Sequence, residues 1–199
     1  QCGMRCLPPC SKETHMSDLI KIHSALAEAM SARSYNTMTP VQEAVLDIEQ
    51  PDADLLVSAQ TGSGKTLAFG LSIATTLLQE DTEFSRPKLP VALIIAPTRE
   101  LALQVRKELE WVYARTKAQF ASCVGGMDPR AERRTLESGA HIVVGTPGRL
   151  RDHIERGALR LSDIKAVVLD EADEMLDMGF REDLTFILEK APVSRRTLL

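Results

Sequence analysis

Short apolar runs alternate along this chain with longer stretches that carry a helical period. The apolar runs are nearly continuous in Val, Ile, Leu and Ala, and they fall at 55–57, 91–96, 120–124, 142–144 and 166–169. Such runs are typical of strands buried on both faces, as in a parallel sheet. Helical periodicity lies between them, at about 65–79, 100–117, 129–138, 148–156 and 180–190. This alternation predicts an α/β fold, a doubly wound parallel sheet with helices on both faces.

Two helices precede this repeating part of the chain. Apolar residues recur at helical spacing over 18–33 and predict an amphipathic helix. A shorter helix begins at Pro40, with Thr39 as its N-cap, and runs to about residue 48. At the other end, residues 195–199 resemble the start of a further strand. We therefore expect the sequence to be a fragment of a longer protein.

Composition narrows the class of protein. The chain has 199 residues and a mass of 21.9 kDa, which is room for one ordinary domain. Its formal net charge of −4 at pH 7 excludes a generally basic nucleic-acid wrapper but leaves room for a local basic face. No apolar stretch approaches the roughly 20 residues of a membrane helix, so we expect no membrane partner.

Three of the four cysteines crowd the first ten residues, and the fourth is Cys123. A secreted disulfide framework would spread its cysteines through the fold, so we expect a reduced, cytoplasmic protein. We interpret residues 1–15 as a leader added to the natural sequence, and residues 16–199 as the domain itself. The alternative is a Cys₃His zinc site made of Cys2, Cys6, Cys10 and His15.

A phosphate-binding loop follows the first apolar run and opens a helix. It fits the pattern G-x-x-x-x-G-K-[ST], except that Ala59 replaces the first glycine. Glycines let backbone N–H groups turn toward oxyanions, and the helix N-terminus adds partial positive charge. Lys65 would reach the β- and γ-phosphates, and the Thr66 hydroxyl would take a Mg²⁺ position. The predicted nucleotide-binding residues here are Ala59, Gln60, Thr61, Gly62, Ser63, Gly64, Lys65 and Thr66.

An acidic pair ends a later apolar run. Asp170 directly follows residues 167–169, and a carboxylate at such a strand end can hold Mg²⁺ directly or through water. Glu171 comes next and can orient or deprotonate an attacking water. We therefore predict Lys65, Asp170 and Glu171 as catalytic residues, and Thr66 with Asp170 as the metal site. The alternative is an acidic helix N-terminus, which the helix dipole favours.

The base that this site reads is indicated by an absent motif and by one glutamine. GTPases usually carry the motif N-K-x-D, which recognises guanine. The only asparagine of this chain is Asn36, and no lysine follows it, so the motif is absent. The side-chain amide of Gln42 offers both a donor and an acceptor, which match two groups on the edge of adenine. A solvated helix glutamine is the alternative.

These motifs, in this order, resemble the DEAD-box ATP-dependent RNA helicases. Residues 170–173 read Asp-Glu-Ala-Asp, the sequence that names the family. Residues 39–42 are similar to its adenine-reading Q motif, with Tyr35 at the aromatic position, although the family's second stacking aromatic is missing near Ser17. The resemblance covers about residues 17–199. It implies the N-terminal RecA-like domain of such an enzyme, with ATP and Mg²⁺ as cofactors.

Three further motifs resemble the family's RNA contacts. Each follows a predicted strand, so they would meet at the carboxyl edge of the sheet, the edge that binds ligands in open α/β folds. Hydroxyls, guanidinium groups and backbone N–H groups there can bind phosphates and sugars without reading sequence. The predicted RNA-binding residues are Pro97, Thr98, Arg99, Gly125, Gly126, Thr146, Pro147, Gly148 and Arg149. The alternative for each arginine is a surface ion pair, and we interpret Arg130, Arg133 and Arg134 as a solvated helix face.

The resemblance implies an ATP-dependent RNA helicase that couples ATP hydrolysis to local opening of RNA duplexes. It also implies a second RecA-like domain of the same protein, beyond Leu199, which supplies arginine fingers. We therefore predict that this chain alone binds nucleotide and single-stranded RNA but hydrolyses ATP very slowly. The alternatives are a non-catalytic RNA-docking or scaffold module and a DNA-directed helicase.

Overall fold

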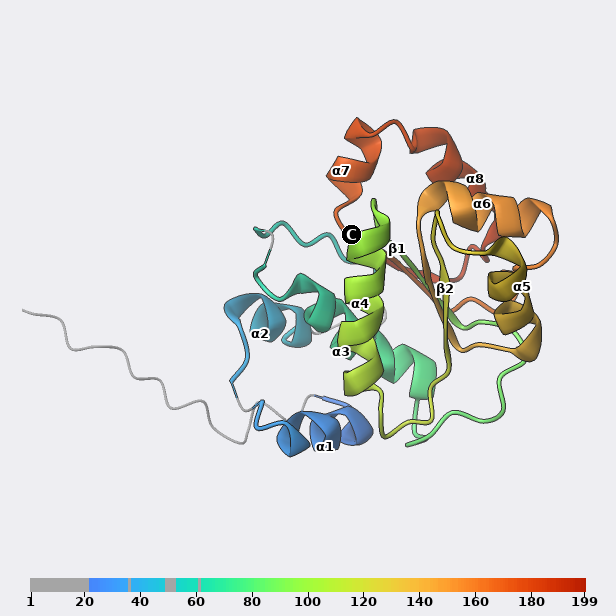
Figure 1. The fold of residues 1–199 in the computed structure, drawn as a ribbon. Coiled ribbons are helices and arrows are strands. Elements are labelled where there is room, and N and C mark those ends of the chain that lie inside the picture. The colour runs from blue at the N-terminus through green and yellow to red at the C-terminus, as the bar shows by residue number, and fades with distance from the viewer. Residues whose placement is uncertain (1–21, 36, 49–52, 61) are drawn as a thin grey trace, which may run out of the picture.

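The structure is a computed structural model that describes residues 22–35, 37–48, 53–60 and 62–199. In these ranges the chain forms eight helices and five strands (Figure 1). Several predictions lie outside the described residues and stay predictions. They concern the leader over 1–15, the alternative zinc ligands, the first part of the helix over 18–33, and Thr61 of the phosphate loop.

A parallel sheet forms the centre of the molecule. Its strands are β1 (Ala92–Ile95), β2 (Phe120–Cys123), β3 (Ile142–Gly145), β4 (Ala166–Leu169) and β5 (Arg196–Leu198). They lie in the order β2-β3-β1-β4-β5. The register places Ile95 beside both Gly145 and Leu169, so the carboxyl ends of β1, β3 and β4 are level. The segments that follow these strands therefore meet at one edge of the sheet, where the candidate site residues stand.

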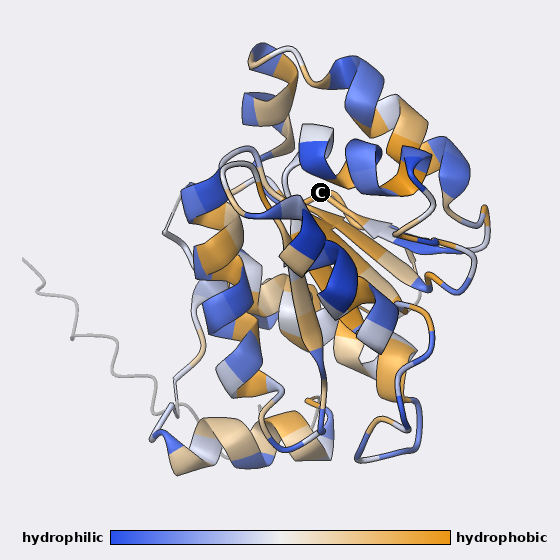
Figure 2. Ribbon diagram, turned by 45° about the vertical axis from the view of Figure 1, so that its right-hand side comes forward, coloured by the Kyte–Doolittle hydropathy of each residue, from blue (hydrophilic) through white to orange (hydrophobic). Residues whose placement is uncertain are grey.

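Helices cover both faces of the sheet (Figure 1). One face carries α1 (Ser24–Ala32), α2 (Pro40–Leu46), α3 (Lys65–Leu78) and α4 (Arg99–Val112), and their apolar side chains cluster with Ile94 and Val144. The other carries α5 (Pro129–Ser138), α6 (Pro147–Glu155), α7 (Ala172–Asp177) and α8 (Arg181–Lys190), which pack with Leu93 and Val143. Because alternate strand residues enter opposite clusters, the central strands β1, β3 and β4 carry no polar side chain, and Figure 2 shows the middle of the sheet largely in orange.

The predicted α/β fold is confirmed, with differences in individual elements. The strand predicted at 55–57 is reduced to an isolated parallel bridge between Leu55 and Leu198. Three backbone hydrogen bonds join Leu55 and Val57 to residues 197 and 199, so the segment does run beside β5 as expected. The helix predicted over 100–117 ends at Val112, because Tyr113 turns into the core and its hydroxyl donates to the Gly70 carbonyl at 2.7 Å.

The short helix α7 escaped prediction, since six residues hold too few turns to show a period. The strand expected near residues 195–199 is present as β5. Among the helices of the described ranges, none combines the length and the apolar character that crossing a membrane requires.

Candidate nucleotide and RNA site

The phosphate loop leads into α3 at the carboxyl edge of the sheet. Gly64, the N-cap of α3, has a φ of +91°, a left-handed conformation that residues with a Cβ rarely adopt. A Cβ there would also lie 2.6 Å from Gln42 Nε2. The Ser63 hydroxyl oxygen is buried without a hydrogen-bond partner among the described residues. An unused hydroxyl beside the N-terminus of a 14-residue helix fits an anionic ligand.

Asp170 lies directly after β4 and faces the start of α3. The Thr66 hydroxyl donates to Asp170 Oδ2 at 3.2 Å. Burial raises the pKa of Asp170 above its usual value, and the hydrogen bond from Thr66 and the charge of Lys65 offset this only in part. Hydroxyl and carboxylate oxygens are the ligands that Mg²⁺ prefers, so this pair fits a bound Mg²⁺.

Lys65 and Glu171 form an ion pair across the same site. The Lys65 Nζ lies 3.4 Å from Glu171 Oε1, and the two side chains are only 13% and 17% exposed. Glu171 has a φ of +54°, which is uncommon for a residue other than glycine. Strained backbone of this kind clusters at functional sites, where the surrounding structure holds it in place.

These residues line an open pocket of about 600 Å³ between the phosphate loop and the end of β4. Its walls include Gln60 and Lys65 from the loop side, and Asp170, Glu171 and Asp173 from the strand side. Ligand pockets of proteins span about 300–1,000 Å³, so this one has room for a nucleotide. Of the predicted catalytic and phosphate-loop residues, Ala59, Gln60, Lys65, Asp170 and Glu171 line this pocket. Thr66 reaches it through its hydrogen bond to Asp170, whereas Gly62, Ser63 and Gly64 are not part of its lining.

Gln42 is buried, with 1% of its surface exposed, so the solvated-glutamine alternative is wrong. Its Nε2 donates to the Gly64 carbonyl at 3.3 Å, and its Oε1 accepts from the Thr39 N–H at 3.0 Å. The Tyr35 hydroxyl lies 3.2 Å from both atoms of the same amide. Gln42 thus ties α2 to the phosphate loop. To hydrogen-bond adenine, its side-chain amide would have to give up some of these hydrogen bonds within the protein.

The predicted RNA-binding residues follow β1, β2 and β3, three adjacent strands of the sheet. Thr98 caps α4 by accepting from the Leu101 N–H at 3.3 Å, and Thr146 stands at the start of α6. The loop after β2 comes so near α4 that a Cβ on Gly126 would lie 2.7 Å from Arg99 Nη1. The fold therefore brings the three motifs to one edge, beside the nucleotide pocket. Two of their residues, Pro97 and Pro147, are buried.

The two arginines of these motifs have different surroundings. Arg149 has a side chain that is 15% exposed, and its Nη1 lies 3.3 Å from Glu132 Oε2. It also donates to the Met127 carbonyl, at 3.4 Å from Nη1 and 3.5 Å from Nη2. Arg99 has only the Met127 sulfur at 3.4 Å and no carboxylate partner within the described ranges. The ion-pair alternative therefore applies to Arg149, although the pair is mostly buried rather than on the surface.

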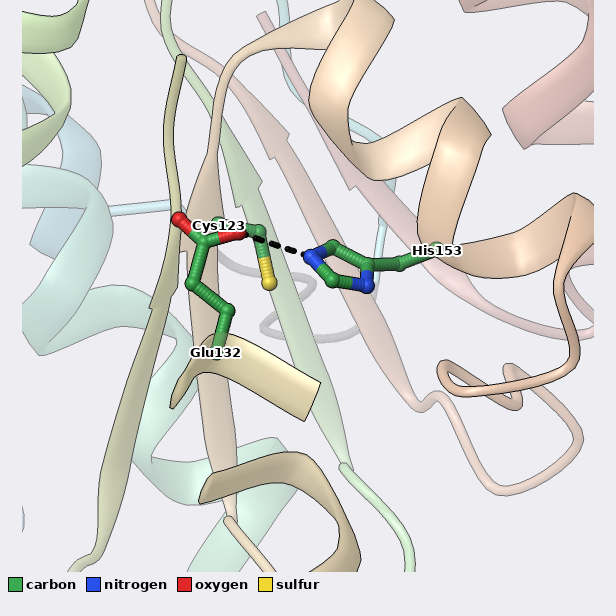
Figure 3. Close-up of side chains that lie close together, drawn as sticks. All are labelled: Cys123, Glu132 and His153. Carbon is green, nitrogen blue, oxygen red and sulfur yellow. Dashed lines mark hydrogen bonds and ion pairs between the residues drawn. The ribbon is translucent and has the colours of Figure 1, made fainter. Parts of the chain in front are cut away.

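Sequence reasoning missed a buried cluster of Cys123, Glu132 and His153 behind this edge (Figure 3). The sequence gives no sign of this cluster, because Glu132 lies in a helix rich in arginine that reads as solvent-exposed. The three arginines of that helix are indeed exposed, as predicted, but Glu132 is buried. The cluster has the ligand types of a metal site. However, His153 Nε2 lies 2.7 Å from Glu132 Oε2, whereas ligands of a tetrahedral zinc stand about 3.3–3.5 Å apart.

Hydrogen bonding, rather than metal ligation, accounts for this cluster. Burial raises the pKa of the Cys123 thiol to about 12, with the charge of Glu132 adding and that of Arg149 opposing. The thiol is therefore protonated at neutral pH, and a metal would have to displace its proton. Glu132 meanwhile accepts from the Val124 N–H at 2.8 Å.

Comparison with known proteins identifies the family. The sequence profile of the DEAD/DEAH box helicases matches residues 39–199. The chain belongs to the DEAD/DEAH box helicase family. The DEAD-box ATP-dependent RNA helicase CshA of Geobacillus kaustophilus is 42% identical to it over 172 residues, which are 86% of this chain and 36% of the relative. DEAD-box ATP-dependent RNA helicase 53 of Oryza sativa is 43% identical over 175 residues, 87% of this chain and 28% of the relative.

A solved structure agrees with the relatives. The crystal structure of a DEAD box protein from the hyperthermophile Methanococcus jannaschii matches with a TM-score of 0.79 and 34% identity, over 89% of this chain and 47% of that one. The resemblance to DEAD-box proteins and the RecA-like form of the α/β fold are thereby confirmed. The chain spans about a third of the length of the curated relatives named above.

Proposed function

We propose that this DEAD-box chain is the domain of an ATP-dependent RNA helicase that binds ATP-Mg²⁺ and single-stranded RNA. One observation carries the proposal: Gln42, Lys65, Thr66, Asp170 and Glu171 converge beside the segments that follow β1, β2 and β3 at one sheet edge. The relatives bear the names of ATP-dependent RNA helicases. Duplex opening, a cytoplasmic location and the second RecA-like domain belong to the same proposal.

The nucleotide half of the site divides its work among few residues. The Gly62–Gly64 backbone and the start of α3 would hold the phosphates, with Lys65 leaving Glu171 to reach them. Thr66 and Asp170 would hold Mg²⁺, which when bound neutralises phosphate charge. Gln42 and Tyr35, already joined by a hydrogen bond, would face adenine.

Glu171 would serve as the group that orients and deprotonates the attacking water. Its ion pair with Lys65 keeps the carboxylate at the floor of the pocket, 3.4 Å from the cation. Once Lys65 turns to phosphate, the Glu171 oxygen that faced it would accept a proton from the attacking water. Arginine fingers of the kind a second domain supplies are worth about 10³–10⁵ in rate, so this chain alone would hydrolyse ATP very slowly.

The RNA half would bind backbone rather than bases. Backbone N–H groups at Gly125, Gly126 and Gly148, with the Thr98 and Thr146 hydroxyls, would contact phosphates and 2′-hydroxyls. Arg99 would supply the free cation, since it lacks a carboxylate partner in the described part of the chain. Such contacts carry no sequence information, so binding would depend on the phosphates and sugars of the nucleic acid rather than on its base sequence.

ATP hydrolysis tests this function directly. We would measure it in this chain and in a protein that carries both RecA-like domains, with RNA, with DNA of equal length, and without nucleic acid. The proposal expects RNA to stimulate the two-domain protein about tenfold or more, and the single chain to run at least about 10³-fold slower. Equal stimulation by DNA supports the DNA-directed alternative. Absence of hydrolysis in both proteins supports the docking-module alternative.

A further inference from the structure

The buried carboxylate of Glu132 joins segments that lie on both sides of the glycine loop. Glu132 is 6% exposed, on α5, and its Oε1 accepts from the Val124 N–H at 2.8 Å. Val124 directly precedes Gly125 and Gly126. One oxygen of Glu132 therefore fixes the backbone where it enters the loop.

The other oxygen fixes the start of α6. Glu132 Oε2 lies 2.7 Å from His153 Nε2 and 3.3 Å from Arg149 Nη1. Arg149 and His153 are four residues apart on one helix, so both side chains point to the same carboxylate. Arg149 in turn donates to the carbonyl of Met127, the residue that leaves the glycine loop. A chain of contacts thus runs from the loop entry through Glu132 and Arg149 to the loop exit.

We propose that Glu132 is a positioning residue for RNA, holding the Gly125–Gly126 loop and the start of α6 in register with one another. This inference rests on the proposed RNA-binding function. Glu132 does not itself face RNA, since it is buried and its oxygens are occupied by Val124, Arg149 and His153. It acts by fixing where the backbone N–H groups of the loop and of α6 point.

This arrangement has a selective consequence. Among the described residues, the partners of the Glu132 carboxylate are Val124, directly after β2, and Arg149 and His153 of α6. The nucleotide pocket is instead lined from the phosphate loop, α3 and the end of β4. Loss of the Glu132 charge should therefore weaken RNA binding while leaving nucleotide binding unchanged. A residue that merely supports the fold would affect both together.

The test uses Glu132→Gln, which keeps the shape and the acceptor for Val124 but removes the charge that Arg149 faces. Glu137→Gln is the matched control, because Glu137 lies on the same helix in an exposed pair with Arg133 at 2.7 Å. A fluorescent ten-nucleotide oligouridylate reports RNA affinity by anisotropy, and calorimetry with Mg-ADP reports nucleotide affinity. Amide resonances of Gly125 and Gly126 report the loop itself.

The expected result is an RNA dissociation constant raised about fivefold or more by Glu132→Gln, with shifted glycine resonances and unchanged ADP affinity. Glu137→Gln should match the parent chain throughout. Equal RNA affinity for the two variants would overturn the inference, as would a parallel loss of RNA and ADP binding. A parent chain that binds ADP but no RNA would instead contradict the proposed RNA function on which the inference rests.

Discussion

At the residue scale, the burial of Asp170 disfavours the ionised form of its carboxyl group. Its folded-state pKa is raised, chiefly by burial, so the ionised form destabilises the nucleotide-free protein. We predict that Asp170→Asn raises the melting temperature of the nucleotide-free chain, because the substitution removes this unfavourable charge. The same change should abolish ATP hydrolysis in a protein with both RecA-like domains, because the proposed Mg²⁺ ligand would be lost.

The pH dependence of that difference has a definite sign. Stability linked to a raised pKa is fully present below the unfolded value and is lost as pH rises through the folded value. The melting temperatures of Asp170→Asn and the parent chain should therefore converge in acid and separate toward neutral pH. Asp81→Asn, at an exposed carboxyl group, serves as the control for the substitution itself. A constant offset between Asp170→Asn and the parent at all pH values would contradict this account.

Arg99 and Arg149 differ in how they should affect RNA binding. Each cation that neutralises a phosphate contributes about 0.7 to the slope of log affinity against log salt for single strands. We predict that Arg99→Gln lowers both affinity and this slope, because its guanidinium has no carboxylate partner in the described ranges. Arg149→Gln should lower affinity with the slope unchanged, because its charge is directed at Glu132. Equal slope changes in the two variants would count against this distinction.

At the scale of elements, two threonine caps stand beside different halves of the proposed site. Thr39 caps α2 with a capping box and holds Gln42, while Thr98 caps α4 at the proposed RNA edge. Replacing either by Ala should cost about 1 kcal/mol of stability. We predict that Thr39→Ala weakens ADP binding and spares RNA binding, and that Thr98→Ala does the reverse. Calorimetry and anisotropy on both variants check this crossed pattern, and loss of both activities in either variant would contradict it.

The elements that could be predicted from the sequence are those whose signal is local. The phosphate loop and Asp170 stand in fixed spacing beside apolar runs, so their placement needed no knowledge of distant contacts. Glu132 could not be found this way, because its burial depends on α5 packing where α6 brings Arg149 and His153. The end of α4 was missed for a similar reason, since Tyr113 leaves the helix to bond Gly70, 43 residues away in sequence.

At the scale of the whole molecule, His141 joins the 80–90 connection to the sheet. Its Nδ1 accepts from the Gln119 N–H at 3.0 Å, and its Nε2 lies 2.8 Å from the Ser85 carbonyl. This requires the neutral ring, with the proton on Nε2. Phe84 stacks against the ring at 4.5 Å. Burial accordingly lowers the pKa of His141 below its usual value, although the bond to Ser85 opposes the shift.

This lowered pKa predicts an acid-sensitive part of the stability. For a histidine with a depressed folded-state pKa, stability is present above the unfolded value of about 6.5 and is lost as pH falls through the folded value. We predict that the free energy of unfolding, measured with urea, falls more steeply below about pH 6.5 for the parent chain than for His141→Gln. Parallel pH profiles for the two proteins would show that the ring does not carry this dependence.

The central claim is that the sheet edge holds an adenine-selective phosphate site. Its most direct test is calorimetric titration of this chain with Mg-ADP and with Mg-GDP, using Lys65→Ala as the control. We expect this chain to bind ADP more tightly than GDP, and we expect Lys65→Ala to weaken ADP binding about tenfold or more. Equal binding of both nucleotides would contradict the role of Gln42 in reading adenine, and no binding of either would contradict the nucleotide site itself.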